Sequence, residues 1–416
     1  MSKPKGTLLV LSQVFIPDPA SVGQHMADAA EEMVRRGYRV IVYTANRGYD
    51  DPSIKFPRRE VIRGIEVRRL AFSSFGKKSI LWRLVGALFF MIQCLAFCGF
   101  TPRLAGILVS TSPPMCAIAA AIIAKFRGVL LKYWVMDLNP DQMIALGRIK
   151  SDSTTARIYD AINRFSLDCA SDVVALDRFM VDRLCRKRNI KDKVVVLPPW
   201  PHEDQLNLIN HADNPFRRQY NPDGKFVIMY SGNHSFTSPL TTILEAALQL
   251  QDCQDLLFLF IGGGVGKKEV DDIIAEHQPT NIVSLPYQPL DQIKYSLSAA
   301  DVHVVSVGEN VAGIVHPCKV YGAMALGRPI LLLGPDPCHV SDIVDEHQIG
   351  WRIAHGAVDD ACKLIQNFTT SDQKKLEGMG KRAQDLIRMR FSKSTLMNAF
   401  CDVLERGLAP SADQSP

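Results

Sequence analysis

The residues most capable of chemistry lie close together in GENVAGIVHPCKVYGAMALGRP, residues 308–329. An apolar run, DVHVV, leads into this glycine-rich loop, and Pro317 and Cys318 precede an amphipathic stretch that begins at Lys319. We expect a strand, a loop and a helix in that order. Lys319 would add a full positive charge to the dipole at the start of the helix, and His316 would add a hydrogen bond. Together they would hold a departing diphosphate, although each residue alone is also typical of a solvated surface.

Glycines follow apolar runs at three further places. Gly23 begins the first helical stretch, where its amide would face a diphosphate. Gly232 lies in the loop SGNHSFTSP, and Ser238 and Pro239 at its end favour an N-cap and a first helical position. The run 262–264 belongs to GGGVGKK, which lacks the spacing and the Ser or Thr of a P-loop. No GxGxxG is present, so a nicotinamide cofactor is not expected, and a plain turn is the alternative for each glycine.

Two polar segments end apolar runs in the first half of the chain. They are TSPP, residues 111–114, and MDLNPD, residues 136–141. Asp137 would orient an acceptor hydroxyl there, unless it only caps a helix or closes a loop. The sequence contains no D-x-D pair and no HExxH. We therefore predict no metal site and no cofactor.

The elements that must position these residues alternate between strand and helix, twice over. The strands are rich in Val, Ile and Leu, as expected of parallel strands buried on both faces. A proline-rich stretch, residues 197–225, interrupts the alternation and is predicted to be a linker. The sequence thus predicts an α/β protein with two doubly wound, Rossmann-like domains. In each domain the carboxyl ends of the parallel strands are expected to face a common cleft. The expected strands are residues 7–11, 39–44, 65–70, 106–110, 130–135, 172–176, 193–197, 226–231, 256–261, 281–285, 301–305, 329–333 and 350–353.

The composition is that of an ordinary globular protein. Of 416 residues, 47% are hydrophobic and 22% charged, which excludes a mainly disordered chain. Ten cysteines include no CxxC pair, so we expect a reducing cytoplasm and no disulfides. The first 200 residues hold 30 basic and 17 acidic side chains, against 18 and 26 in the remainder. A basic first half indicates an anionic partner, but nucleic acid is not expected because aromatic residues do not alternate with these charges.

One apolar segment stands apart: LVGALFFMIQCLAFCGF, residues 84–100, carries no charge. Spanning a bilayer takes about 20 residues, and a Rossmann-like domain continues on both sides, so a membrane span is not expected. The segment is either a buried core helix or a helix that lies in the cytoplasmic leaflet while nearby cations hold anionic head groups. Those cations are Lys55, Arg58, Arg59, Arg63, Arg68, Arg69, Lys77, Lys78 and Arg83.

Six segments carry a resemblance to a known family. They are ASVGQHMADAAEEMVRRGYRVIVYT, VSTSPPMCAIAAAIIAKFRGVLLKYWVMDLNPD, VVVLPPW, YSGNHSF, SAADVHVVSV and HPCKVYGAMALGRPI, and they span most of residues 7–335. In this order they resemble the retaining family-4 glycosyltransferases of the GT-B fold, in the bacterial exopolysaccharide and O-antigen branch. The resemblance implies an acceptor- and membrane-facing domain, residues 1–205, and a nucleotide-sugar-binding domain, residues 206–390. It also implies that residues 391–416 form a helix that crosses back to the first domain and a tail.

The resemblance also implies roles by position. Three residues would be catalytic: Asp137 on the acceptor side, Glu309 at the transferred sugar, and Lys319 at the diphosphate or ribose. No metal ion would take part. The remaining site residues would bind the donor, and they are Gly23, Gly232, Asn233, His234, Gly263, Tyr287, Gln288, His316 and Cys318.

The implied activity is retaining transfer of a hexosyl or N-acetylhexosaminyl group from a nucleotide-diphosphate sugar, most commonly a UDP-sugar. The acceptor would be lipid-linked or a saccharide, and the protein would be cytoplasmic with peripheral contact at the inner face of the cell membrane. The chain departs from the family pattern at three places. Gly322 replaces the second Glu, and Asn139 replaces an aromatic residue. No basic pair follows Gly232. The alternatives are a sugar-nucleotide 2-epimerase of the same fold and a catalytically degenerate binding protein.

Overall fold

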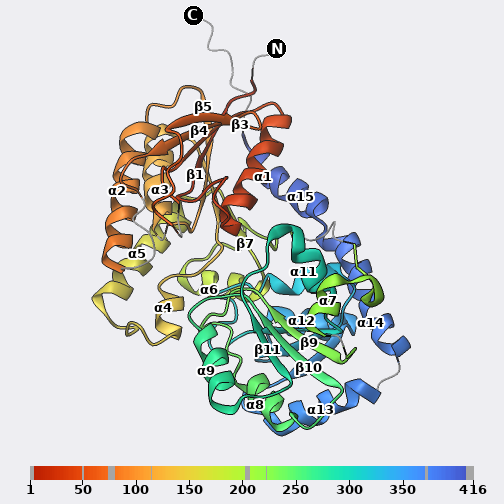
Figure 1. Cartoon of the computed structure of the whole chain (residues 1–416). Coiled ribbons are helices and arrows are strands. Elements are labelled where there is room, and N and C mark those ends of the chain that lie inside the picture. The colour runs from red at the N-terminus through yellow and green to blue at the C-terminus, as the bar shows by residue number, and fades with distance from the viewer. Residues whose placement is uncertain are drawn as a thin grey trace, which may run out of the picture. The chain divides into compact units, whose positions relative to one another are not determined.

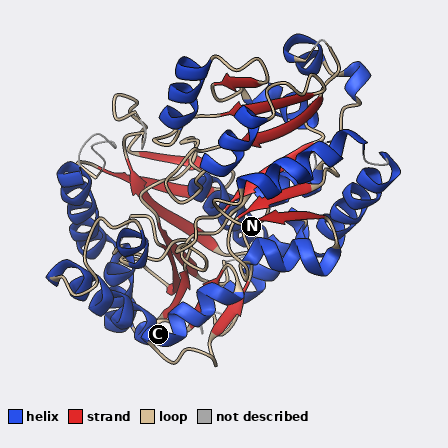
Figure 2. Cartoon of the chain, turned by 90° about the horizontal axis from the view of Figure 1, so that it is seen from below, coloured by secondary structure: helices blue, strands red, loops and turns tan. Residues whose placement is uncertain are grey.

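The chain folds into two units, each built on its own parallel sheet. The computed structural model describes residues 4–48, 51–73, 80–113, 115–201, 207–221, 223–370 and 373–408. The first unit comprises Met1–Pro199 with Leu396–Pro416, and the second comprises Trp200–Thr395. Strands and flanking helices make up most of both units (Figures 1 and 2).

An eight-stranded sheet organises the first unit. Its strands are β1 (Thr7–Leu11), β2 (Arg39–Ala45), β3 (Arg59–Ile62), β4 (Ile65–Leu70), β5 (Leu104–Ser110), β6 (Leu130–Trp134), β7 (Asp172–Ala175) and β8 (Val194–Val196). They lie in the order β3-β4-β2-β1-β5-β6-β7-β8, and all neighbours are parallel except β3 and β4. The order reverses at β1, so ligands are expected at the carboxyl ends of β1 and β5. The antiparallel edge strand β3 was not predicted from the sequence.

A six-stranded sheet organises the second unit. Its strands are β9 (Phe226–Ser231), β10 (Leu256–Ile261), β11 (Ile282–Leu285), β12 (Val302–Ser306), β13 (Ile330–Leu333) and β14 (Gly350–Ile353). All neighbours are parallel in the order β11-β10-β9-β12-β13-β14. The order reverses between β9 and β12, which places the expected binding crevice at the carboxyl ends of these two strands.

Helices cover both sheets. Those of the first unit are α1 (Ser21–Arg35), α2 (Ile80–Cys98), α3 (Cys116–Arg127), α4 (Asp141–Ala145), α5 (Thr154–Cys169), α6 (Arg178–Lys187) and most of α15 (Lys393–Glu405). Those of the second are α7 (Pro215–Tyr220), α8 (Thr241–Gln249), α9 (Lys267–His277), α10 (Ile293–Ser298), α11 (Lys319–Ala325), α12 (His339–His347), α13 (Val358–Thr370) and α14 (Gln373–Leu386). Two 3₁₀ turns (His211–Asp213 and Leu290–Gln292) and a π-helical turn (Ile387–Phe391) complete the second unit.

The core of the second unit lies on both faces of its sheet. Along β9, Ile228 and Tyr230 pack into the cluster that includes α8 and α13, whereas Val227 and Met229 pack into a separate cluster on the other face. Successive side chains of a strand point to opposite faces, so a strand covered on both faces is apolar throughout. This arrangement leaves only the strand ends available for polar chemistry.

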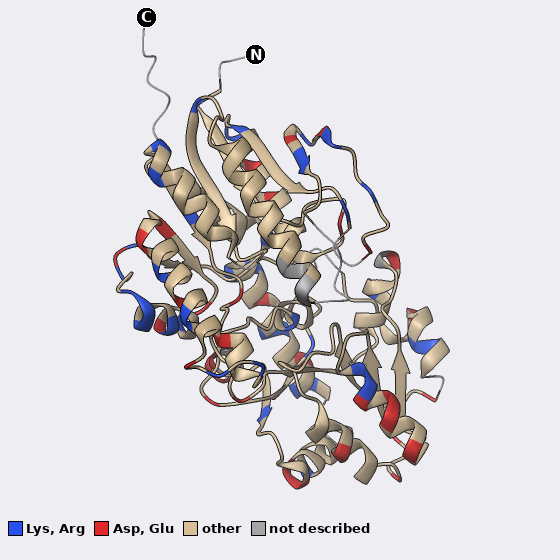
Figure 3. Ribbon diagram, turned by 90° about the vertical axis from the view of Figure 1, so that its left-hand side faces the viewer, with Lys and Arg blue, Asp and Glu red and all other residues tan. Residues whose placement is uncertain are grey.

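Helix α2 contains most of the apolar segment that the sequence singled out, and it is buried on one face only. Phe90, Cys94 and Cys98 are fully buried. Residues 84–100 carry no acidic or basic side chain (Figure 3). No helix among the described residues is both long and apolar enough to span a bilayer. The large apolar side chains on the exposed face are Trp82, Leu88, Phe89, Ile92, Leu95 and Phe97, with Phe100 just beyond the helix.

Several basic residues of the expected cluster form ion pairs within the first unit. Arg69 is buried and pairs with Glu60, and Arg63 Nη1 lies 3.1 Å from a carboxylate oxygen of Glu31. Arg68 Nη2 lies 3.2 Å from a carboxylate oxygen of Glu66 in β4. Buried Arg69 therefore does not belong to the exposed basic cluster that we expected. The described members that are exposed are Lys55, Arg58, Arg59 and Arg63. Lys77 and Lys78 lie outside the described residues.

Helix α15 completes the core of the first unit. The Phe400 ring lies 4.3 Å from the Trp134 ring, centroid to centroid, next to β6. Arg36, just after α1, donates to Asp402 at 2.6 Å and to Glu405 at 2.8 Å. Buried Lys132 donates to the Arg406 carbonyl at 2.6 Å. The last helix is thus held by one aromatic contact and two sets of charge-assisted hydrogen bonds.

Candidate functional site

The loops at the switch point of the second sheet bring most of the predicted donor-binding residues together. Gly232 directly follows β9, and residues 307–318 connect β12 to α11, which begins at Lys319. Gly232 has a φ of +128°, which side chains rarely allow. A Cβ on Gly232 would lie 2.5 Å from Lys319 Cε. The glycine is therefore required both by its backbone conformation and by the close approach of the lysine.

Lys319 lies against this loop as a partly buried cation. Its ammonium group donates to the Tyr230 hydroxyl and, at 2.9 Å, to the Asn233 carbonyl. It also lies 4.3 Å from the centroid of the Tyr230 ring. Burial lowers the pKa of Lys319 to about 8, because both hydrogen-bond acceptors are neutral and do not offset the loss of water. The ammonium group is therefore a positioned positive charge that can stabilise a bound anion.

His234 follows in the same loop but turns inward. Its side chain is 1% exposed, and Nδ1 lies 3.0 Å from the Gly232 carbonyl oxygen. Burial, together with the charges of Lys267 and Lys319, lowers the pKa of His234 to about 4. The imidazole is thus neutral at pH 7. It stabilises the loop through its contact with the Gly232 carbonyl and does not present a cation to a phosphate.

Tyr287 and Gly263 meet next to this loop. The Tyr287 hydroxyl donates to the Gly263 carbonyl at 3.2 Å, and a Cβ on Gly263 would lie 3.0 Å from the tyrosine ring. The Tyr287 side chain is nevertheless 59% exposed, so its ring can still stack on a base. Gln288 is half-buried, and its amide donates to the Pro286 carbonyl at 2.9 Å.

His316 belongs to a hydrogen-bonded trio that the sequence did not reveal. The Tyr321 hydroxyl lies 2.8 Å from His316 Nε2 and 2.8 Å from His339 Nε2. Tyr321 itself is buried at the start of α11. One hydroxyl donates only once, so at least one of the two imidazoles must donate to it. The trio fixes the orientation of His316 three residues before Lys319.

The remaining predicted residues of the second unit are less constrained. Glu309 is exposed in the turn after β12, and Cys318 is exposed directly before α11. The Cys318 thiol donates weakly to the His316 carbonyl at 3.5 Å. Gly322, where the family usually has a carboxylate, is buried within α11.

In the first unit, Gly23 packs more tightly than expected but its amide is already used. The Gly23 N–H donates to the Ala20 carbonyl at 2.9 Å, so it is not the open phosphate donor that we anticipated. A Cβ on Gly23 would lie 3.1 Å from Phe15 Cα and 3.2 Å from its nitrogen. Gly23 therefore lets the first turn of α1 approach the loop after β1.

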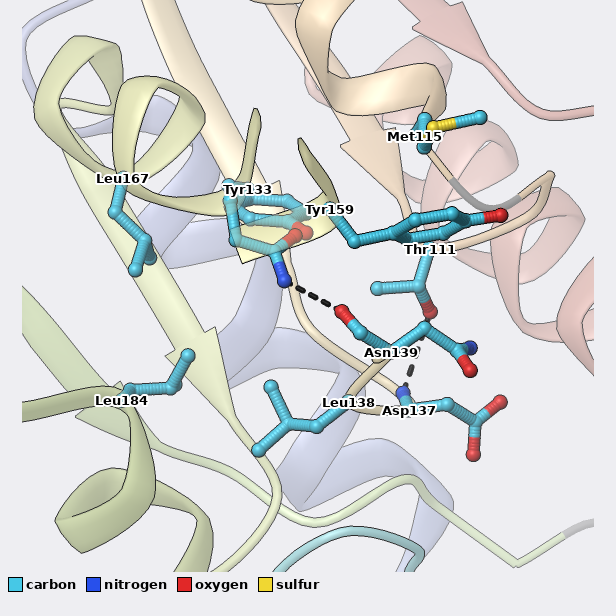
Figure 4. A pocket seen from close by; sticks show the side chains of 10 residues that line it. Thr111, Met115, Tyr133, Asp137, Leu138, Asn139, Tyr159, Leu167 and Leu184 are labelled. Atoms are coloured by element: carbon cyan, nitrogen blue, oxygen red, sulfur yellow. Dashed lines mark hydrogen bonds between the residues drawn. The ribbon is translucent and has the colours of Figure 1, made fainter. Parts of the chain in front are cut away.

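Asp137 lies at the carboxyl end of β6 beside a small pocket. Its backbone N–H donates to Thr111 Oγ1 at 3.3 Å, and in Figure 4 its carboxyl group points away from Tyr133 and Leu167. Burial raises the pKa of Asp137 to about 6. The pocket volume of about 20 Å³ is enough for about one water molecule. The sequence located Asp137 and Thr111, but it did not indicate Tyr159, which α5 adds to the pocket wall.

Comparisons with known proteins identify the family. A family model named glycosyl transferase 4-like domain matches residues 21–200, and a model named glycosyl transferases group 1 matches residues 213–386. The chain belongs to the GT-B glycosyltransferases. This GT-B glycosyltransferase is 26% identical to a probable glycosyltransferase, WbjE, of Pseudomonas aeruginosa over 71% of the chain and 72% of the relative. It is 25% identical to a putative colanic acid biosynthesis glycosyl transferase, WcaI, of Escherichia coli over 77% of the chain and 81% of the relative.

Solved structures confirm the predicted fold of this GT-B glycosyltransferase. Sucrose-phosphate synthase from Thermosynechococcus elongatus aligns with a TM-score of 0.75 at 15% identity, covering 96% of this chain and 98% of that one. HepE from Anabaena in complex with UDP-glucose aligns with a TM-score of 0.69 at 14% identity, covering 96% of this chain and 100% of that one. At such low identity the alignments establish the fold alone.

Proposed function

We propose that this glycosyltransferase moves a hexosyl or N-acetylhexosaminyl group from a UDP-sugar to a lipid-linked or saccharide acceptor, with retention, in cell-surface polysaccharide synthesis. The Escherichia coli relative is named for colanic acid biosynthesis, and HepE has been solved with UDP and with UDP-glucose. These names support the donor class and the pathway class.

The observation that carries the proposal is the position of Lys319 over the Gly232 loop. Glycosyl transfer from a nucleotide sugar is limited by departure of the diphosphate, on which negative charge develops. Lys319 is held by Tyr230 and the Asn233 carbonyl, so its charge needs no rearrangement when the bond breaks. The absence of a side chain at Gly232 lets Lys319 come close to the backbone of this loop.

The transfer itself needs no protein nucleophile in this scheme. The bond from the anomeric carbon to the diphosphate oxygen breaks, and its electron pair leaves with the nucleoside diphosphate. The acceptor hydroxyl oxygen attacks the same face of the sugar, and its proton passes to a phosphate oxygen of the leaving group. Asp137 orients the acceptor hydroxyl, and Glu309 contacts the transferred sugar. Lys319 supplies the positive charge, so no divalent metal is needed.

A ligand panel with matched variants tests the donor assignment. We expect UDP-sugars to raise the melting temperature of the wild type more than GDP- or dTDP-sugars do. Lys319→Ala should abolish most of that shift, whereas Lys363→Ala, which removes an exposed lysine of α13, should leave it intact. Equal shifts in Lys319→Ala and wild type would contradict the proposal. Conversion of a UDP-sugar without any acceptor would instead indicate an epimerase.

We also propose that the exposed face of α2 contacts the membrane that carries a lipid-linked acceptor. Apolar side chains recur along this face at helical spacing, including Leu88, Phe89, Ile92 and Leu95. At the end of the helix, Phe100 is 85% exposed. When an apolar helix face lies in the interface of a leaflet, burial of its apolar surface area contributes favourable binding free energy.

Vesicle sedimentation tests the membrane contact. Wild type should sediment with vesicles of phosphatidylglycerol and phosphatidylcholine, and the double variant Ile92→Asp with Phe97→Asp should stay in the supernatant. Met389→Asp changes an apolar residue of the second unit that is even more exposed, and it serves as the control. Sedimentation of the double variant at the level of wild type would refute the contact.

A further inference from the structure

A groove of about 480 Å³ lies on the second unit, between the loop after β9 and one face of α9. Small-molecule sites typically have volumes of about 300–1,000 Å³. The loop lines the groove with His234, Phe236 and Ser238, and the opposite wall includes Glu269 and Asp272. Of the residues expected to bind the donor, only His234 lines this groove.

His234 gives the groove a buried hydrogen-bond acceptor. Its Nδ1 faces the Gly232 carbonyl, and a carbonyl oxygen can only accept, so Nδ1 carries the proton and Nε2 keeps a lone pair. Nε2 is buried, and no hydrogen-bond partner for it exists within the described ranges of the chain. A buried acceptor without a partner costs free energy that a ligand hydroxyl can recover. A ligand that reaches this atom must therefore bring a donor.

The facing helix is also rich in acceptors. Glu269, Asp272 and Glu276 are spaced so that they share one face of α9, and all three line the groove. Glu269 accepts from the Thr241 hydroxyl at 2.6 Å, and Asp272 pairs with Lys268. Lys268 offsets the charge of one of these three carboxylates, and the other two leave this wall of the groove with a net negative charge. The wall therefore repels anions and attracts hydroxyl donors.

Apolar side chains stand at the rim of the groove. Phe236 is 57% exposed and Val265 is 63% exposed. An aromatic ring beside carboxylates and hydroxyls can cover the C–H face of a sugar ring while the polar groups accept from its hydroxyls. We propose that this groove binds a neutral saccharide, at a site whose lining includes neither Lys319 nor Tyr287. The proposal does not depend on the catalytic role of Lys319.

Saturation-transfer NMR on the full chain tests this site with donor binding suppressed. In the presence of saturating UDP, we would measure glucose, galactose, fucose, N-acetylglucosamine, lactose and cellobiose. At least one of them should give a signal, and Phe236→Ala should weaken its binding about fivefold or more. Phe126→Ala removes an exposed phenylalanine of the first unit and should leave binding unchanged.

The charge of the groove gives a second readout. Glucuronate should bind more weakly than glucose, and Glu269→Gln combined with Asp272→Asn should narrow that difference. Asp272 is exposed and Glu269 is half-buried, and both substitutions preserve the size of the side chain, so the fold should be retained, which circular dichroism checks. Absence of any saccharide signal, loss of the signal on adding UDP, or equal binding by wild type and Phe236→Ala would each overturn the proposal.

Discussion

Lys319 Nζ lies 4.3 Å from the centroid of the Tyr230 ring and donates to the hydroxyl of the same residue. The lysine begins α11 and the tyrosine is near the end of β9, so the pair joins the two strand–loop–helix segments at the switch point of the second sheet. The contact fixes the position of the ammonium group in the absence of any ligand. A positioned charge of this kind acts on a leaving group without reorganisation.

Removal of this charge should slow the chemical step. We expect Lys319→Ala to lower kcat about 100-fold or more, the usual effect of losing one preorganised donor to a developing anion. Initial rates of nucleoside diphosphate release would measure it. Lys363→Ala is the control, and a kcat within twofold of wild type in Lys319→Ala would remove the lysine from the scheme.

The pH dependence of kcat/KM should be bell-shaped. Lys319 acts in its charged form, and burial lowers its pKa to about 8, so activity should fall as pH rises above about 8. Asp137 acts as a carboxylate, and burial raises its pKa to about 6, so activity should fall as pH drops below about 6. In kcat the alkaline limb should move to higher pH, because a bound diphosphate raises the pKa of the lysine. Asp137→Asn should abolish the acid limb; an unchanged acid limb would exclude Asp137.

Gly232→Ala should disturb donor binding because its Cβ would lie 2.5 Å from Lys319 Cε. We expect at least about tenfold weaker UDP binding by calorimetry, since the lysine must move. Gly356→Ala is a matched control: it also has positive φ, +81°, but a Cβ there would meet nothing within 4 Å. Both variants carry backbone strain, so equal losses of affinity would show that strain alone is responsible.

Chelation should leave the reaction unaffected. The proposed scheme meets the leaving charge with Lys319 and backbone groups. Turnover after treatment with EDTA and desalting should therefore equal that of untreated enzyme, with or without added magnesium. A loss restored by a divalent cation would contradict metal independence.

Arg36→Ala should loosen α15 from the first unit. The substitution removes hydrogen bonds to Asp402 and Glu405, which we expect to cost about 1 kcal/mol because the pairs are partly exposed. The midpoint of thermal unfolding should fall by about 2–4 °C. Arg35→Ala is the control, because Arg35 is more exposed and its ion pair is with Glu32 of the same helix. It should lower the midpoint less than Arg36→Ala does. Equal midpoints for the two variants would count against the anchoring role.

The sequence predicted the strands well because apolar runs between loops are distinctive in parallel sheets. The edge strand β3, REVI, was missed because it is short, mostly exposed and half charged, so its pattern resembles a loop. The apolar segment of α2 was ambiguous between a core and an interface helix, and the structure shows one buried and one exposed face.

The site was predictable where glycine spacing marked a strand end, as at Gly232. The partner of His316 was not, because Tyr321 and His339 belong to different helices and only the fold brings their side chains together. The sequence also located Gly23 at the start of α1, but it could not show that the Gly23 amide donates to the Ala20 carbonyl.

The place of α15 has a consequence for how the protein is made. The Trp134 ring of the first unit packs on Phe400, which leaves the ribosome only after the whole second unit has been synthesised. Until then the nascent first unit must keep part of its apolar surface uncovered, so a fragment that stops at Pro199 should be prone to aggregate, and the last helix acts as the closing step of folding.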